Sequence, residues 1–210
     1  MKRTKQILSL ALCAILLVSA TVATTVAYLT SQDAVTNTFT VGKVAITLDE
    51  QDVDDTDKDQ NTTERDKENS YKILPGQTYT KDPIIHVSNE DGTEDCYLFV
   101  KVTDEIKAIQ ADKTVETQML EKGWEKLDGV ADVWYWTGDA NATTITEKQT
   151  VVSKGTDVDV FDNFKITDSV DNVGLAKYAG KTIVVKAYAI QVAGFEDKTP
   201  VEIWEAADFE

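Results

Sequence analysis

Cysteine and histidine are almost absent from this chain of 210 residues, which contains two cysteines and one histidine. Cys13 lies in an apolar N-terminal run, so a chain cleaved after that run keeps only Cys96 and forms no intramolecular disulfide. Cys96 begins the alternating segment CYLFVKV and shares one strand face with apolar residues, which predicts a buried thiol. A catalytic cysteine needs a neighbouring base, and nothing in the sequence brings His86 beside Cys96.

The motifs of common hydrolases and nucleotide-binding enzymes are missing as well. The chain has no H-E-x-x-H pair, no G-x-S-x-G turn, no Walker loop and no dinucleotide-binding glycine pattern. One histidine cannot build a histidine-rich zinc site, so zinc hydrolysis is nearly excluded. Acidic residues are abundant enough to leave a glycosidase pair open, although no local sequence singles one out. The sequence therefore predicts a protein that is not an enzyme, with no catalytic residue and no bound cofactor.

Positive charge is also scarce. The chain holds 21 basic and 37 acidic residues, and its formal net charge is −16. Residues 1–27 contain three of the basic residues and none of the acidic ones, so the remainder has 18 basic against 37 acidic residues and a formal charge of −19. Such a surface repels nucleic acid and anionic membranes, and it fits cationic, calcium-bridged or carbohydrate partners.

The N-terminal residues have the order of an export signal. Three basic residues within the first five precede an apolar run at residues 7–18, and small residues follow. Thr25 and Ala27 occupy the small positions three and one residues before a cut, which predicts cleavage by a signal peptidase before Tyr28. The mature protein is then secreted, without stable membrane contact. An uncleaved anchor is the alternative, since residues 7–26 have roughly the 20-residue length of a membrane span.

Residues 51–70 form an acidic insertion with a single apolar residue, Val53, which predicts an exposed loop. Its carboxylates at alternate positions partly match an EF-hand loop, but Gln60 stands where glycine is required and Asp66 replaces the final glutamate. A solvated loop is one interpretation and a weak calcium site is the other. The candidate calcium ligands are Asp55, Asp57 and Asp59.

Short alternating segments with turn residues between them dominate the chain after residue 36. They predict an all-β fold, a jelly-roll-like β-sandwich formed as a single domain by residues 28–210. The predicted strands are 39–41, 44–48, 78–81, 84–88, 96–103, 124–127, 133–137, 145–152, 158–166 and 182–192. One or two short helices are expected. Helical spacing at 112–123 ends at Gly123, and Thr199 with Pro200 begins a closing helix at 200–209.

The most aromatic segment is WYW at residues 134–136. In a strand Trp134 and Trp136 point to one side and Tyr135 to the other, which favours packing between two sheets. The alternative is an exposed platform on which sugar rings stack.

Several segments together resemble one family of exported proteins. The junction AYLT at residues 27–30 and the segment TNTFTVG at 36–42 are similar to the signal and mature start of proteins processed by the SipW type of signal peptidase. The segments LPGQ at 74–77, VFDNF at 160–164 and AYAIQ at 187–191 resemble others in that group, the TasA and camelysin-like proteins of Gram-positive bacteria.

The resemblance implies a jelly-roll β-sandwich, export, and assembly into extracellular biofilm-matrix fibres. We therefore expect a secreted or cell-surface fibre subunit whose principal partner is another copy of itself. Residues 28–38 carry few apolar side chains and precede the first convincing strand, so this leader is expected to add as a strand to a sheet edge of a neighbouring copy. Its anchors are Tyr28, Val35 and Phe39. The alternatives are a camelysin-like metallopeptidase, for which no zinc motif is present, and a monomeric adhesion or glycan-binding module.

Overall fold

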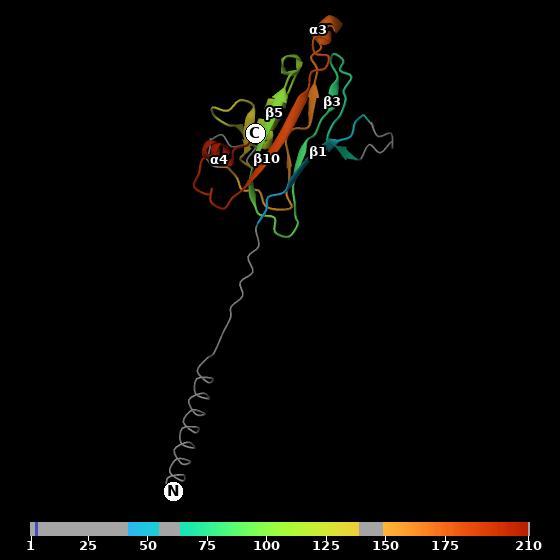
Figure 1. Cartoon of the computed structure of the whole chain (residues 1–210). Helices are drawn as coiled ribbons and strands as arrows, with labels where there is room; N and C mark the ends of the chain where they lie inside the picture. The colour runs from blue at the N-terminus through green and yellow to red at the C-terminus, as the bar shows by residue number, and fades with distance from the viewer. Residues whose placement is uncertain (1–2, 4–41, 55–63, 139–148, 210) are drawn as a thin grey trace. The chain divides into compact units, whose positions relative to one another are not determined.

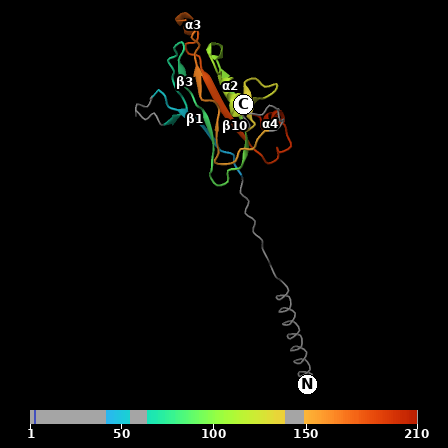
Figure 2. The same ribbon diagram turned by 180° about the vertical axis from the view of Figure 1, so that it is seen from behind.

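The computed structural model describes residue 3 and residues 42–54, 64–138 and 149–209. The chain divides into two units, Met1–Thr40 and Val41–Glu210, and the fold described below belongs to the second. It is mostly β, with antiparallel sheets of four, two and four strands. Figure 1 shows the strands and short helices, and Figure 2 shows the same ribbon from behind.

The first four-stranded sheet has the order β2-β1-β4-β8. Its strands are β1 (Ile46–Gln51), β2 (Arg65–Asp66), β4 (Ile84–Val87) and β8 (Asp157–Asp159). β2 pairs with only the last two residues of β1, because Glu50 lies opposite Asp66 and Gln51 opposite Arg65. The rest of β1 pairs with β4 alone.

The second four-stranded sheet has the order β10-β5-β7-β6. Its long strands β5 (Cys96–Asp104) and β10 (Ile183–Gln191) pair along nine residues each. The shorter strands β7 (Val133–Trp136) and β6 (Trp124–Lys126) continue the sheet. In both views β10 runs between β5 and β1, so the two sheets approach each other there (Figures 1 and 2).

A small third sheet joins β3 (Thr78–Thr80) to β9 (Asn163–Lys165). A turn precedes β3, in which Gln77 N–H donates to Leu74 O and Gly76 has a φ of 73° that glycine adopts without strain. The three short helices of the described part are α2 (Val115–Lys122), α3 (Asn172–Ala176) and α4 (Pro200–Ala207), and η1 (Lys107–Ile109) is a single 3-10 turn.

The alternation along β5 separates two apolar cores. Cys96, Leu98, Val100 and Val102 face a core shared with Ile85 of the first sheet, so both four-stranded sheets contribute side chains to it. The residues between them, Tyr97 and Phe99, face a second core that includes Ile203 and Trp204 of α4. α4 therefore covers the outer face of the second sheet, and β5 is buried on both sides.

Helix boundaries follow the chemistry of their end residues. The Thr114 side chain accepts a hydrogen bond from Thr117 N–H at the start of α2, and Gly123 ends that helix with a φ of 98°. Thr199 and Glu202 form a reciprocal capping box at the start of α4, and Pro200 occupies its first turn. Both predicted helices are confirmed.

Four expectations need correction. A third helix, α3, exceeds the one or two that were predicted. Residues 158–166 are not one strand, because β8 and β9 belong to different sheets. The predicted strand at 145–152 lies partly outside the described residues, and its described part contributes only the isolated bridge of Val152 to Cys96. The acidic insertion is interrupted by β2, and Asp52 at its start is only 5% exposed.

Candidate functional site

β10 leaves one long edge of the second sheet open in the part of the chain that the structure describes. Glu105 N–H donates to Thr182 O over 3.0 Å, and Val192 N–H donates to Asp95 O over 3.2 Å. Because ladder hydrogen bonds alternate along an antiparallel pair, the even-numbered residues between these points bond to β5. The peptide groups of Ile183, Val185, Ala187 and Ala189 therefore point away from β5, toward an edge where no described strand pairs.

β1 presents a second open edge toward β10. Ser88 N–H donates to Ala45 O over 2.9 Å, so the odd-numbered residues of β1 bond to β4. The peptide groups of Val44, Ile46 and Leu48 point the other way, and β2 covers only the far end of that edge. Among the described residues, the two sheets thus face each other with two edges along which no strand pairs, apart from β2 at the end of β1.

The side chains at these two edges are apolar and point inward. Val44, Ile46 and Leu48 on one side pack against the core between the sheets, and so do Ile183, Val185, Ala187 and Ala189 on the other. All seven are only partly buried. The described residues therefore cover the core between the sheets incompletely along the line where β1 and β10 approach each other.

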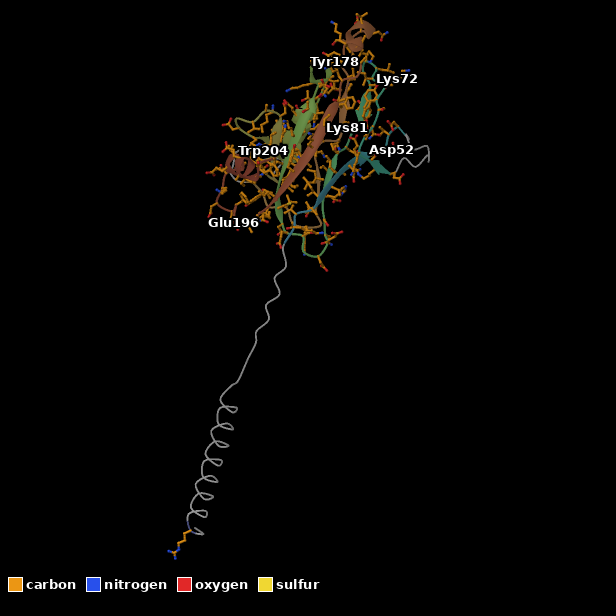
Figure 3. All side chains as sticks on the ribbon, in the orientation of Figure 1. Asp52, Lys72, Lys81, Tyr178, Glu196 and Trp204 are labelled. Carbon is orange, nitrogen blue, oxygen red and sulfur yellow. The ribbon has the colours of Figure 1, made fainter. Side chains whose placement is uncertain are left out.

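A groove of about 960 Å³ lies at one end of this line, and we call it the edge groove. Its walls are formed by β1, by β10, by residues 66–74 and by α3 with the residues after it. Apolar and aromatic side chains line much of it, among them Leu48, Tyr71, Phe164, Leu175, Tyr178 and Val185. Figure 3 labels Tyr178 near α3 and Lys81 farther down the molecule.

A cluster of three aromatic side chains packs at the wall of the groove. The rings of Tyr79 and Phe164 are stacked with centroids 5.2 Å apart, and Tyr71 meets Phe164 edge to face at the same distance. Tyr71 Oη donates to Thr80 O over 2.9 Å, which ties residues 66–74 to β3. Burial and the nearby carboxylates of Glu50, Asp82 and Asp54 raise the pKa of the Tyr71 hydroxyl above its ordinary value. That hydroxyl therefore stays protonated at neutral pH and remains a hydrogen-bond donor.

A network of charged side chains joins the strands of the first sheet beside the groove. Arg65 on β2 pairs with Asp49 on β1, and its Nη1 lies 3.2 Å from Asp82 Oδ2. Asp49 also lies 3.1 Å from Nε2 of His86 on β4, whose Nδ1 is 2.6 Å from Asp157 Oδ1 on β8. Partial burial lowers the pKa of His86, but the hydrogen bonds to Asp157 and Asp49 outweigh it and raise that pKa above the ordinary value. The network links β2, β1, β4 and β8.

The outer edge formed by β8 differs chemically from this pair. The outward residues of β8 are Asp157 and Asp159. Asp159 O already accepts a hydrogen bond from Trp124 Nε1 over 2.8 Å, and the Asp159 carboxylate pairs with Lys122. Charged residues on an edge discourage pairing with another strand. Along the middle of the apolar edges the charged side chains are Lys186 on the outer face of β10 and Asp49 on β1, and Asp49 is held by Arg65.

Several predicted site residues lie outside the described residues. These are the cleavage residues Thr25, Ala27 and Tyr28, the assembly anchors Tyr28, Val35 and Phe39, and the calcium candidates Asp55, Asp57 and Asp59. Within residues 42–54, 64–138 and 149–209, no group of three or more His, Cys, Asp and Glu side chains could hold a metal ion.

The predicted burial of Cys96 is confirmed. Its side chain is 0% exposed, and burial together with the charge of Asp95 raises the pKa of the thiol to about 11. Cys96 pairs through its backbone with Gln191 and with Val152, whereas the ring of His86 is held by Asp49 and Asp157. The thiol is thus a core group, protonated at neutral pH.

The prediction that the tryptophans of β7 pack between the two sheets is confirmed. Trp134 is 2% exposed and belongs to the core between the sheets, and Trp136 packs against that core with its ring centroid 5.1 Å from that of Trp124. A sugar-stacking platform made by both indoles needs both rings to be exposed to solvent. The burial of Trp134 therefore excludes this alternative.

Sequence reasoning missed the edge groove altogether. The alternation of residues 182–192 predicted β10 correctly, but nothing in a strand's own sequence tells an edge strand from a central one.

No described helix is long and apolar enough to cross a membrane. No protein-family model, no curated protein and no solved structure matches this chain.

Proposed function

We propose that this protein is an exported structural subunit that assembles into extracellular fibres by strand addition, and that the edge groove receives the leader of a neighbouring copy. The observation that supports this most directly is the pair of apolar edges on β1 and β10, along most of which no described strand pairs. A single extended segment added along one of these edges would bond to it and cover the core between the sheets, which would complete a jelly-roll-like β-sandwich. Main-chain bonds would supply affinity, and side chains on one face would enter the core.

The leader has the composition that such a site requires. Residues 28–41, which are the leader and the three residues after it, number fourteen, and β10 offers an edge of nine residues. In an extended conformation Val35, Phe39 and Val41 share one face, because successive side chains alternate. That face matches the inward apolar side chains at the two edges. Tyr28 lies on the opposite face, where it would contact the surface of the receiving copy.

Charge does not oppose this contact locally. The edge groove is lined by four carboxylates and three lysines, so it is nearly balanced although the chain as a whole is strongly acidic. These groups are Asp49, Glu50, Asp66 and Glu68 with Lys67, Lys81 and Lys181. The leader contains a single charged residue, Asp33. Contact between a leader and the next copy is heterologous, and it produces a filament when it does not close into a ring.

Electron microscopy of the secreted protein tests the proposal. The net charge of about −19 outside the signal opposes association between copies, so filaments are expected to increase with acid or divalent cations and to decrease at neutral pH and low salt. Deleting residues 28–36 is expected to abolish filaments while leaving a folded monomer. Filaments of the truncated protein, or a full-length protein that stays monomeric under all these conditions, would contradict strand addition.

A matched pair of substitutions tests the position of the site. Val185→Glu places a carboxylate on the inner face of the open edge and is expected to block assembly. Leu120→Glu is the control, because Leu120 is 53% exposed on α2 and does not line the groove. Circular dichroism establishes that both variants are folded. Equal filament yields from the two variants would place the contact elsewhere.

A further inference from the structure

A lysine, a glutamate and an asparagine meet in a partly enclosed site beside β1. Lys81 Nζ lies 2.6 Å from Glu50 Oε2, and Asn69 Nδ2 donates to Glu50 Oε1 over 3.0 Å. The Glu50 side chain is 6% exposed and the Lys81 side chain 11%. One carboxylate therefore contacts an amine and a carboxamide at the same time, away from most solvent.

The orientation of the carboxamide is fixed by the groups around it. Asn69 Nδ2 also donates to Gln51 O over 2.9 Å, and Asn69 Oδ1 accepts from Val53 N–H over 2.8 Å. The nitrogen thus faces two acceptors and the oxygen faces a donor, so the amide cannot be reversed. The backbone N–H of Val53 polarises the carbonyl and could stabilise negative charge on its oxygen.

We propose that Lys81 and Asn69 form an intramolecular isopeptide bond, with Glu50 as the proton-transfer group. The inference is independent of the proposed assembly, because it concerns the chemistry of one folded chain. Nucleophile and base are within hydrogen-bond distance of each other, which is the arrangement that activates a nucleophile.

The steps balance without any further reagent. Glu50 takes a proton from the Lys81 ammonium, and the neutral Nζ attacks Cγ of Asn69. The oxyanion that forms on Oδ1 is held by Val53 N–H. Glu50 moves a proton from the attacking nitrogen to Nδ2, and the Cγ–Nδ2 bond breaks. An Nζ–Cγ amide remains, and ammonia leaves with the remaining proton as ammonium.

The bond would join two segments that border the edge groove. Asn69 lies in residues 66–74, and Lys81 directly follows β3. These segments already touch, because Tyr71 Oη donates to Thr80 O over 2.9 Å. A covalent link there would hold the wall of the groove in a chain that lacks an intramolecular disulfide once Cys13 is removed.

Mass spectrometry of the purified full chain tests the proposal. The bond lowers the mass by one ammonia, about 17 Da. Trypsin is expected to leave Lys81 uncut and to release a branched peptide in which residues 68–72 are attached to residues 73–101. Asn69→Asp is expected to give the same branched peptide through loss of water. A wild-type protein at its full sequence mass, with no branched peptide, would overturn the proposal.

Two variants separate this bond from other chemistry at Asn69. Cyclisation of Asn69 with Ser70 to a succinimide also releases ammonia, but it does not need Lys81. Lys81→Arg is expected to restore the full mass, and a deficit that persists in this variant would refute the cross-link. Glu50→Gln is expected to stop the reaction, and an intact branched peptide in that variant would refute the role of Glu50. Lys181→Arg, which changes an exposed ion pair with Glu105, is the control and should keep the bond.

Discussion

Substitution of Gln118 tests which hydrogen bonds stabilise the segment beside the groove. It lies on α2, and only 5% of the residue is exposed. Its Nε2 donates to Asn163 O over 2.8 Å, and its Oε1 accepts from the backbone N–H groups of Asp162 and Asn163. One side chain thus satisfies three backbone groups in the segment that leads to Phe164, which lines the groove.

Gln118→Met keeps the length of the side chain and removes every hydrogen bond. Each backbone group left without a partner in a buried place costs about 1–3 kcal/mol. Three such groups give at least about 3 kcal/mol, and water reaching the segment would offset part of it. We therefore expect the free energy of unfolding to fall by about 2–4 kcal/mol, a large share of the stability of a typical domain.

Urea unfolding followed by tryptophan fluorescence measures this change. Glu121→Met on the same helix is the matched control, because Glu121 is exposed and its ion pair is with the exposed Lys113. That variant should change the free energy of unfolding by less than about 0.5 kcal/mol. A loss below about 1 kcal/mol for Gln118→Met, with an unchanged dependence on urea, would refute the assignment of Gln118 as the anchor of this segment.

Three further predictions concern titration, reactivity and capping. The pKa of His86 is higher in the folded protein than in the unfolded chain, so the protonated ring stabilises the fold. This stabilisation is complete below the unfolded pKa of about 6.5 and is lost as pH rises through the folded pKa. The free energy of unfolding should therefore decrease over that pH interval in the wild type and not in His86→Gln. Cys96, buried and with its pKa raised to about 11, should react with a thiol reagent at pH 8 only after unfolding, as a peptide map would show. Thr199→Ala removes the capping box of α4 and should cost about 1 kcal/mol in thermal or urea unfolding.

Each of these has a result that would count against it. An equal pH slope in wild type and His86→Gln would mean that the ring is not coupled to Asp49 and Asp157 on folding. Native labelling of Cys96 at the rate of the unfolded chain would contradict its burial in the core. An unchanged stability of Thr199→Ala would show that the side-chain bonds to Glu202 do not stabilise α4.

Local patterns were sufficient for much of the secondary structure. The period of two along residues 96–103 predicted both the strand and the face that carries Cys96, because alternation places successive side chains on opposite sides. Gly123 and Thr199 marked helix ends correctly, since a left-handed end and a side-chain cap depend on single residues.

Partners far apart in the sequence were decided only by the tertiary structure. Glu50 meets Lys81 across 31 positions, and Gln118 meets Asn163 across 45. Nothing in a short window distinguishes Gln118 from a solvent-exposed glutamine of a helix, because its partners are backbone groups of a distant segment. The split of residues 158–166 into β8 and β9 has the same origin, since pairing with β4 and β3 assigns the two halves to different sheets.

The sequence by itself determined the alternating strands, the capped helices, the acidic charge and the order of an export signal. It did not determine that β1 and β10 are neighbouring edges of the sheets that the described residues form, because the position of a strand in a sheet depends on which other strands pair with it. It also did not determine the meeting of Lys81, Glu50 and Asn69, which requires three separate segments to fold against one another. Burial and register are properties of the assembled sheets, and only long-range packing creates them.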